Sequence, residues 1–131
     1  MTAPGRTLVR VVVEGRGTWF EGLRAVLEPG GVVVVGRSRS CDVSLRKSQH
    51  FRHLPDKDDV LRSREFNRVS RIHCELTLVG PSQVEVRDLS VNGTWVDGER
   101  VRGSAVADLS DGAVEVAPVE GALGTLLLRG E

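Results

Sequence analysis

Three short segments of the sequence carry residue types suited to binding an oxyanion. They are Gly36-Arg37-Ser38, Ser70-Arg71-Ile72-His73 and Asn92-Gly93-Thr94. A guanidinium can hold two oxygens of a phosphoryl group, a serine hydroxyl can donate to another, and an asparagine amide both donates and accepts. Taken singly, each segment also has an ordinary structural explanation: a solvated arginine, a serine in a turn, or the first position of a hairpin turn.

Catalysis is a poor explanation for the same side chains. Ser70, His73 and Asp88 have the residue types of a serine hydrolase, but a serine three residues before a histidine at a strand start does not by itself align a nucleophile with its base. The glycine motif of an oxyanion hole does not accompany them. We therefore predict no catalytic residues and a protein that is not an enzyme.

A zinc site is a second alternative, suggested by two cysteines and three histidines. These residues are Cys41, His50, His53, His73 and Cys74. Their spacing fits no established pattern of zinc ligands, and His73 and Cys74 are adjacent on a predicted strand, so their side chains point to opposite faces. We predict no metal and no cofactor, with both cysteines as free thiols in the core.

Composition excludes several other classes of protein. The 131 residues fit a single domain, 1–131, and 40% of them are hydrophobic, so a packed core is expected. The formal net charge is zero, whereas a general nucleic-acid binder normally carries a basic excess. No apolar run approaches the length of a membrane helix or of the core of a signal peptide. We expect a cytoplasmic protein that binds neither nucleic acid nor membranes.

Short apolar segments at regular spacing predict an all-β fold. The expected strands are Leu8–Val13, Val32–Val35, Asp42–Leu45, Ile72–Val79, Gln83–Leu89, Thr94–Val96, Arg100–Val101, Ala105–Leu109, Ala113–Val116 and Ala122–Leu128. Residues Trp19–Leu27 fit either a short helix or a strand with a bulge at Gly22. The uninterrupted valine run at 32–35 suggests a strand buried on both faces. Many short strands of this kind are typical of a β-sandwich or a β-barrel.

Residues 46–68 interrupt the pattern with a polar, charged segment. It holds seven basic and four acidic side chains, a net charge of +3 with histidine counted as neutral. A loop of this length is functional, mobile, or contains a short helix of its own. Asp56 could cap such a helix over residues 58–65.

In their order, and each at a strand end, the three segments resemble the forkhead-associated (FHA) domain, a phosphothreonine-reading family. Cys41-Asp42-Val43 and Leu109-Ser110-Asp111-Gly112 also look like features of this family. The resemblance covers about residues 8–129. It implies a two-sheet β-sandwich of roughly eleven short strands (FHA/SMAD-like), here with the long charged insertion at about 46–68.

The resemblance also implies a role for each residue of the three segments. The residues expected to bind the phosphopeptide are Arg37, Ser38, Ser70, Arg71, Val91 and Asn92. Those expected to support the site are Gly36, His73, Gly93 and Thr94. Among them, Arg37 is the main phosphate ligand, Ser70 is the second, and His73 is a buried brace between loops. Val91 departs from the family, because a serine or threonine often stands at this position; its backbone N–H could still donate.

By this resemblance the chain is a phosphothreonine-dependent binding module in signalling. Its expected partner is a protein that a Ser/Thr kinase has phosphorylated on threonine. The alternative is a scaffold of the same fold that binds a non-phosphorylated partner. Arg37, Ser70 and Asn92 argue against it, whereas the hydroxyl missing at Val91 keeps it open. The basic segment 46–68 ends two residues before Ser70, so we predict that it favours acidic residues flanking the phosphothreonine. A solvated, mobile insertion is the competing prediction.

Overall fold

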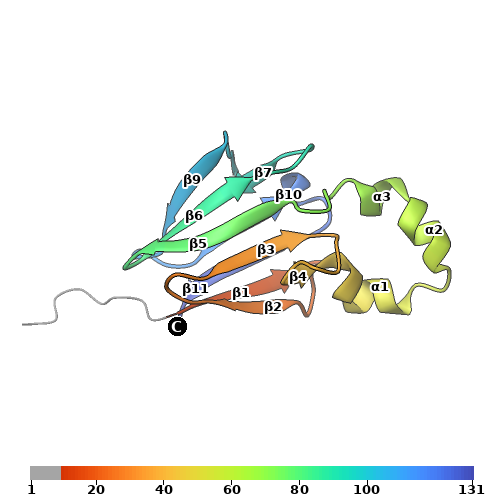
Figure 1. The fold of residues 1–131 in the computed structure, drawn as a ribbon, viewed down its shortest axis with the longest axis horizontal. Helices are drawn as coiled ribbons and strands as arrows, with labels where there is room; N and C mark the ends of the chain where they lie inside the picture. Colours follow the sequence, from red (N-terminus) through yellow and green to blue (C-terminus); the bar gives the residue numbers. More distant parts are fainter. Residues whose placement is uncertain (1–9) are drawn as a thin grey trace, which may run out of the picture.

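The structure is a computed structural model that describes residues 10–131, so Leu8 and Val9 of the first predicted strand lie outside the described residues. Its eleven strands form two sheets that pack face to face, with three short helices at one end (Figure 1). The two-sheet β-sandwich of roughly eleven strands predicted from the sequence is confirmed.

The larger sheet has six strands in the order β2-β1-β11-β10-β7-β8. Their bounds are β1 (Val11–Arg16), β2 (Arg24–Leu27), β7 (Thr94–Val96), β8 (Glu99–Arg100), β10 (Val114–Pro118) and β11 (Thr125–Gly130). Its neighbouring strands pair antiparallel, and β1 pairs with β11 from Val11↔Gly130 to Arg16↔Thr125. The first and last described strands therefore lie side by side in the sheet.

The smaller sheet has five strands in the order β4-β3-β5-β6-β9. Their bounds are β3 (Val32–Gly36), β4 (Val43–Ser44), β5 (Cys74–Gly80), β6 (Gln83–Asp88) and β9 (Ser104–Asp108). The pair β3 and β4 is parallel, and the other pairs are antiparallel. Strands β3 and β6 end, and strands β5 and β7 begin, at the end of the sandwich that carries the helices (Figure 1).

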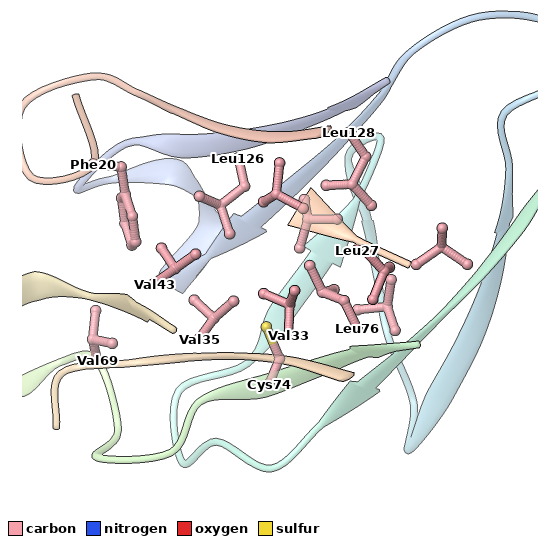
Figure 2. Close-up of a cluster of buried hydrophobic side chains, with 14 of the residues drawn as sticks. Phe20, Leu27, Val33, Val35, Val43, Val69, Cys74, Leu76, Leu126 and Leu128 are labelled. Carbon is pink, nitrogen blue, oxygen red and sulfur yellow. The ribbon is translucent and has the colours of Figure 1, made fainter. Parts of the chain in front are cut away.

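The core lies between the two sheets and is built from alternate residues of each strand, as period-2 patterning requires. Figure 2 shows the facing side chains: Leu27, Leu126 and Leu128 from the six-stranded sheet, and Val33, Val35, Cys74 and Leu76 from the five-stranded sheet. The prediction that the valine run is buried on both faces is wrong. Val33 and Val35 are buried, but Val32 is 49% exposed, because the outer face of β3 has no second layer over it.

Residues Trp19–Leu27, ambiguous in sequence, form a turn followed by a strand rather than a helix. The turn ends at Gly22, whose φ of +85° suits glycine, and β2 then begins at Arg24. Trp19 and Phe20 are 2% and 0% exposed, so this turn delivers two aromatic side chains to the core.

The charged segment is ordered: it folds into a 3₁₀ turn, η1 (Leu45–Lys47), and three short helices, α1 (Gln49–His53), α2 (Lys57–Arg62) and α3 (Arg64–Asn67). Each begins at a side chain that accepts a backbone N–H, namely Ser44, Ser48, Asp56 and Ser63. Asp56 caps a helix as predicted, but that helix ends at Arg62, because the extended Ser63 caps α3 and so interrupts it. We call residues 45–69 the helical insertion.

Candidate functional site

Three loops meet at the end of the sandwich that carries the helical insertion. One follows β3, one links α3 to β5, and one links β6 to β7. Backbone hydrogen bonds join the first two: Arg37 N–H donates to Ser70 C=O (3.1 Å) and Ser38 N–H donates to Arg71 C=O (3.1 Å). The structure therefore brings the first two predicted segments into direct contact, although more than thirty residues separate them in the sequence.

Gly36 allows this close approach. A Cβ atom at this position would lie 2.2 Å from the backbone oxygen of Arg71 and 3.0 Å from the Sγ of Cys41. Since real Cβ contacts are never this short with a backbone atom, only glycine fits where the β3 loop crosses the loop before β5.

The Arg37 side chain is half-buried and held at its base. Its Nε–H donates to Val69 C=O (2.8 Å), and within residues 10–131 no carboxylate pairs with the guanidinium. Burial lowers the pKa of Arg37, and the positive charge of nearby Arg71 lowers it further. An arginine nevertheless stays charged at neutral pH. Two neighbouring cations without a carboxylate form a region of positive potential suited to an anion.

Ser70 lies beside Arg37 with its hydroxyl in a defined orientation. The Val91 N–H donates to Ser70 Oγ (3.0 Å), which ties the β6–β7 loop to the loop before β5. Because Oγ accepts this bond, its own hydrogen remains able to donate. Val91 thus uses its N–H within the site, while its side chain is 85% exposed.

His73 is fully buried and bridges two of the loops. Its Nδ1 accepts from Ser70 N–H (3.1 Å), and its Nε2 lies 2.7 Å from Gly93 C=O. Because Nδ1 faces a donor and Nε2 faces an acceptor, the ring is neutral with its proton on Nε2. Burial lowers the pKa of His73, outweighing the hydrogen bond to Gly93 that raises it. The imidazole accepts from the Ser70 backbone rather than from its hydroxyl, so it is not placed as a base for that hydroxyl.

Asn92 is exposed at the tip of the β6–β7 loop and is anchored on the helical insertion. One Nδ2 hydrogen donates to Arg68 C=O (2.8 Å). This leaves the second Nδ2 hydrogen and the Oδ1 as an adjacent donor and acceptor, the pair that an extended peptide backbone requires. The next residue, Gly93, has a φ of +101°, and a Cβ there would lie 2.7 Å from the Trp95 ring.

Asp88 organises the base of the β6–β7 loop, a role that the sequence analysis did not assign. Its Oδ1 accepts from Ser90 N–H (3.0 Å), Ser90 Oγ–H (2.5 Å) and Thr94 Oγ1–H (2.8 Å). Burial by itself raises the pKa of Asp88, but these hydrogen bonds outweigh burial and hold the pKa below its ordinary value. The Asp-x-Ser spacing, which is typical of a carboxylate that accepts from the backbone two residues on, was the available signal.

Two of the predicted ligand residues make no side-chain hydrogen bond to the other residues of this arrangement. Ser38 directs its hydroxyl into its own loop, where the two Oγ atoms of Ser38 and Ser40 are 2.9 Å apart. Arg71 is exposed, and its backbone oxygen accepts from Ser38 N–H and Cys41 Sγ. The structure therefore gathers Arg37, Ser70 and Asn92 at one rim, with His73 and Thr94 buried beneath them.

The cysteines are not part of this site. Cys41 and Cys74 are free and buried, and burial raises the pKa of both thiols. Across residues 10–131, no group of three or more His, Cys, Asp or Glu side chains is arranged to hold a metal ion. In the same part of the chain, no helix has the length and apolar character needed to cross a membrane.

Comparison with known structures shows the same fold in FHA domains. The FHA domain of the CT664 protein from Chlamydia trachomatis is 21% identical, with a TM-score of 0.62, over 93% of this chain and 98% of the other. The FHA domain of a hypothetical protein from Arabidopsis thaliana is 17% identical, with a TM-score of 0.63, over 99% and 92%. The yeast Dun1 FHA domain, solved with a doubly phosphorylated (pT) peptide derived from Rad53, is 22% identical, with a TM-score of 0.52, over 98% and 79%.

Comparison with curated protein sequences found no match. The sequence does match the model of the FHA domain family over residues 33–114, more than half of the chain, and this range contains all three loops of the site. The resemblance stated from the sequence is confirmed, and the chain belongs to the FHA domain family of phosphopeptide-binding modules.

Proposed function

We propose that this chain is a single domain that binds threonine-phosphorylated proteins and has no catalytic activity. The observation that carries the proposal is the meeting of Arg37, Ser70 and Asn92 at one rim. Each is held by one hydrogen bond and retains further hydrogen-bonding capacity: the Nη donors of Arg37, the hydroxyl hydrogen of Ser70 and the amide of Asn92.

A phosphoryl dianion matches the Arg37 and Ser70 donors in number and charge. It offers three acceptor oxygens and a charge near −2 at neutral pH. Charge-assisted hydrogen bonds of this kind contribute about 1.5–3 kcal/mol each. Arg71 adds long-range attraction, since its charge is close enough to lower the pKa of Arg37. Asn92 would then hold the extended backbone next to the phosphorylated residue.

The proposal includes a preference for phosphothreonine over phosphoserine. The γ-methyl of threonine would enter a small apolar niche, which contributes only about 1 kcal/mol. We expect the domain to bind a phosphothreonine peptide with a dissociation constant in the micromolar range, a binding free energy of about −8 kcal/mol. Such an affinity suits reversible signalling in the cytoplasm, in which a Ser/Thr kinase phosphorylates the partner. The peptide-bound Dun1 domain, whose ligand is doubly phosphorylated on threonine, offers a precedent in the same fold.

Isothermal titration calorimetry tests the proposal directly. A degenerate phosphothreonine peptide library, followed by its best single peptide, is titrated into the parent protein and the Arg37→Ala variant. We expect micromolar binding by the parent and a loss of more than a hundredfold in the variant. The variant should stay folded, with only a small fall in melting temperature from the lost hydrogen bond to Val69 C=O. Arg87→Ala is the matched control, because Arg87 is an exposed arginine within strand β6, and it should bind normally. Equal affinity of the parent and Arg37→Ala would refute phosphate recognition.

The same experiment addresses the alternative of a non-phosphorylated partner. Val91 has no side-chain hydroxyl, and its N–H is bonded to Ser70, so this position adds no side-chain donor for phosphate. Equal binding of a peptide and its unphosphorylated form would favour that alternative. We expect the unphosphorylated peptide not to bind measurably.

A further inference from the structure

The C-terminal part of the helical insertion contacts two of the proposed ligand residues. It does so through backbone oxygens: Val69 C=O accepts from Arg37 Nε, and Arg68 C=O accepts from Asn92 Nδ2. Its α3 helix also places the Phe66 ring beneath the Arg37 guanidinium, with 6.0 Å from Cζ to the ring centroid. The insertion is therefore in contact with the site, not merely next to it in sequence.

Arg37 is fixed from two directions by these contacts. The Val69 oxygen holds the Nε edge of the guanidinium, and the Phe66 ring lies near its face at the outer limit of a cation–π contact. Phe66 is 1% exposed, so its own position is set by packing. A long arginine side chain otherwise samples many rotamers, and restricting it before binding reduces the entropy lost when the phosphate arrives.

Phe66 is in turn held by an aromatic cluster that joins the insertion to the sandwich. Its ring centroid is 5.6 Å from that of Trp19 and 5.7 Å from that of Phe51. The indole N–H of Trp19, which comes from the turn before β2, donates to Glu65 in α3. A helix of four residues is not stable alone, so this packing is what keeps α3 in place.

Local hydrogen bonds complete the support of α3. Ser63 Oγ accepts from Phe66 N–H (3.1 Å) at its start. The Asn67 Nδ2 donates to the backbone oxygens of Leu61 (2.9 Å) and Ser63 (2.8 Å), which fixes α3 against the end of α2. The carbonyls of Arg68 and Val69 follow immediately, so their directions depend on how α3 is seated.

We propose that the helical insertion positions the phosphopeptide site, with Phe66 as the positioning residue for Arg37. This rests on the proposed function for its consequence in binding, but its structural part concerns the free protein. The insertion sets how tightly the site binds any phosphothreonine peptide, because it orders the ligand residues Arg37 and Asn92 before the peptide binds.

The test compares Phe66→Leu with Phe51→Leu. Both substitutions remove a ring from the same buried cluster, but Phe66 lies under Arg37, whereas Phe51 lies near Arg46 and Lys57. Phe66→Met, whose unbranched and flexible side chain can refill the space of the ring, replaces Phe66→Leu if that variant does not fold. The measurements are the melting temperature, calorimetric affinity for the selected phosphothreonine peptide, and the ¹⁵N heteronuclear NOE of the Arg37 Nε–H in the free protein.

We expect Phe66→Leu to weaken binding about tenfold and to lower the Arg37 Nε–H NOE. Phe51→Leu, which removes a neighbour of Phe66 rather than the ring under Arg37, should lower the melting temperature by a similar amount but cause a clearly smaller loss of affinity and of NOE. Equal loss of affinity in both variants, or a rigid Arg37 Nε–H in Phe66→Leu, would overturn the proposal. If the parent binds no phosphopeptide, the proposed function fails while the NOE comparison still decides whether Phe66 positions Arg37.

Discussion

His73 offers a sharp test of how the site is held together. It is fully buried, accepts from Ser70 N–H and donates to Gly93 C=O, so it links the loop before β5 to the loop before β7. Substituting His73 with alanine removes this bridge without touching the phosphate-facing side of Arg37. We therefore expect His73→Ala to lose stability and binding together.

The expected loss of stability follows from two contributions. The Ser70 N–H loses its acceptor, at a cost of about 1–3 kcal/mol, whereas Gly93 C=O keeps the bond from Val119 N–H and adds little. The missing ring leaves roughly 60 Å³, which at about 24 cal/mol per Å³ adds about 1.5 kcal/mol. The total is about 2.5–4.5 kcal/mol, or a fall of about 10–18 °C in melting temperature at about 4 °C per kcal/mol.

The pH dependence of the free energy of unfolding provides an independent test of the role of His73. Burial lowers the pKa of His73 in the folded protein below 6.5, so the unfolded chain binds more protons in the interval between the two values. This contribution to stability is fully present above pH 6.5 and decreases as the pH falls toward the folded pKa. The parent should lose stability over this interval, and His73→Ala should lose less.

Chemical denaturation between pH 5 and pH 7.5 measures both effects. The matched control is His53→Ala, which removes an exposed histidine at the end of α1 and should leave the melting temperature unchanged. The argument is wrong if His73→Ala melts like the parent, or if its stability depends on pH between 5 and 6.5 as strongly as that of the parent.

Three further variants test other parts of the site. Gly36→Ala should destabilise the protein by about 1–3 kcal/mol in thermal unfolding, because its Cβ would lie 2.2 Å from Arg71 C=O; unchanged stability would mean that the loops separate easily. Asp88→Asn should reduce the loss of stability on acidification below pH 3.8, since the pKa of Asp88 is lowered in the folded state; an identical acid transition would refute this. Arg68→Gln should reduce any preference for acidic residues beside the phosphothreonine by under about 1 kcal/mol in calorimetry at low salt, and the difference should vanish near 1 M salt; a variant that discriminates as the parent does would mean that Arg68 does not read the flanks.

The strand pattern could be predicted because alternation reports directly on a one-sided sheet. Segments such as Gln83–Leu89 alternate between buried and solvent-facing residues, and the structure places β6 at Gln83–Asp88. The valine run led to a wrong prediction because it lacks this alternation. An uninterrupted apolar run does not by itself show whether a second layer covers both faces of the strand. Val32 is 49% exposed, although the run of four valines has the apolar sequence that is typical of a strand buried on both faces.

Site residues could be predicted where a sequence motif specifies the residue type at a given position. The geometry of these residues in the folded protein could not be predicted in this way. The order of the three segments led to Arg37, Ser70 and Asn92. Asp88 was overlooked because its importance lies in three hydrogen bonds that form only when the β6–β7 loop closes. The orientation of the Val91 N–H toward Ser70 likewise depends on a contact across twenty-one residues.

The helical insertion shows that the charge of a segment describes only part of its role. Its net charge of +3 suggested a surface that reads the ligand, or a mobile loop. Its buried residues tell more: Phe51, Val60 and Phe66 belong to the hydrophobic core, and four capping side chains determine where each turn begins. Replacing residues 48–64 with a flexible linker would therefore remove the support of Arg37 along with the charges. Only single-charge substitutions such as Arg68→Gln can separate reading of the ligand from positioning of the site.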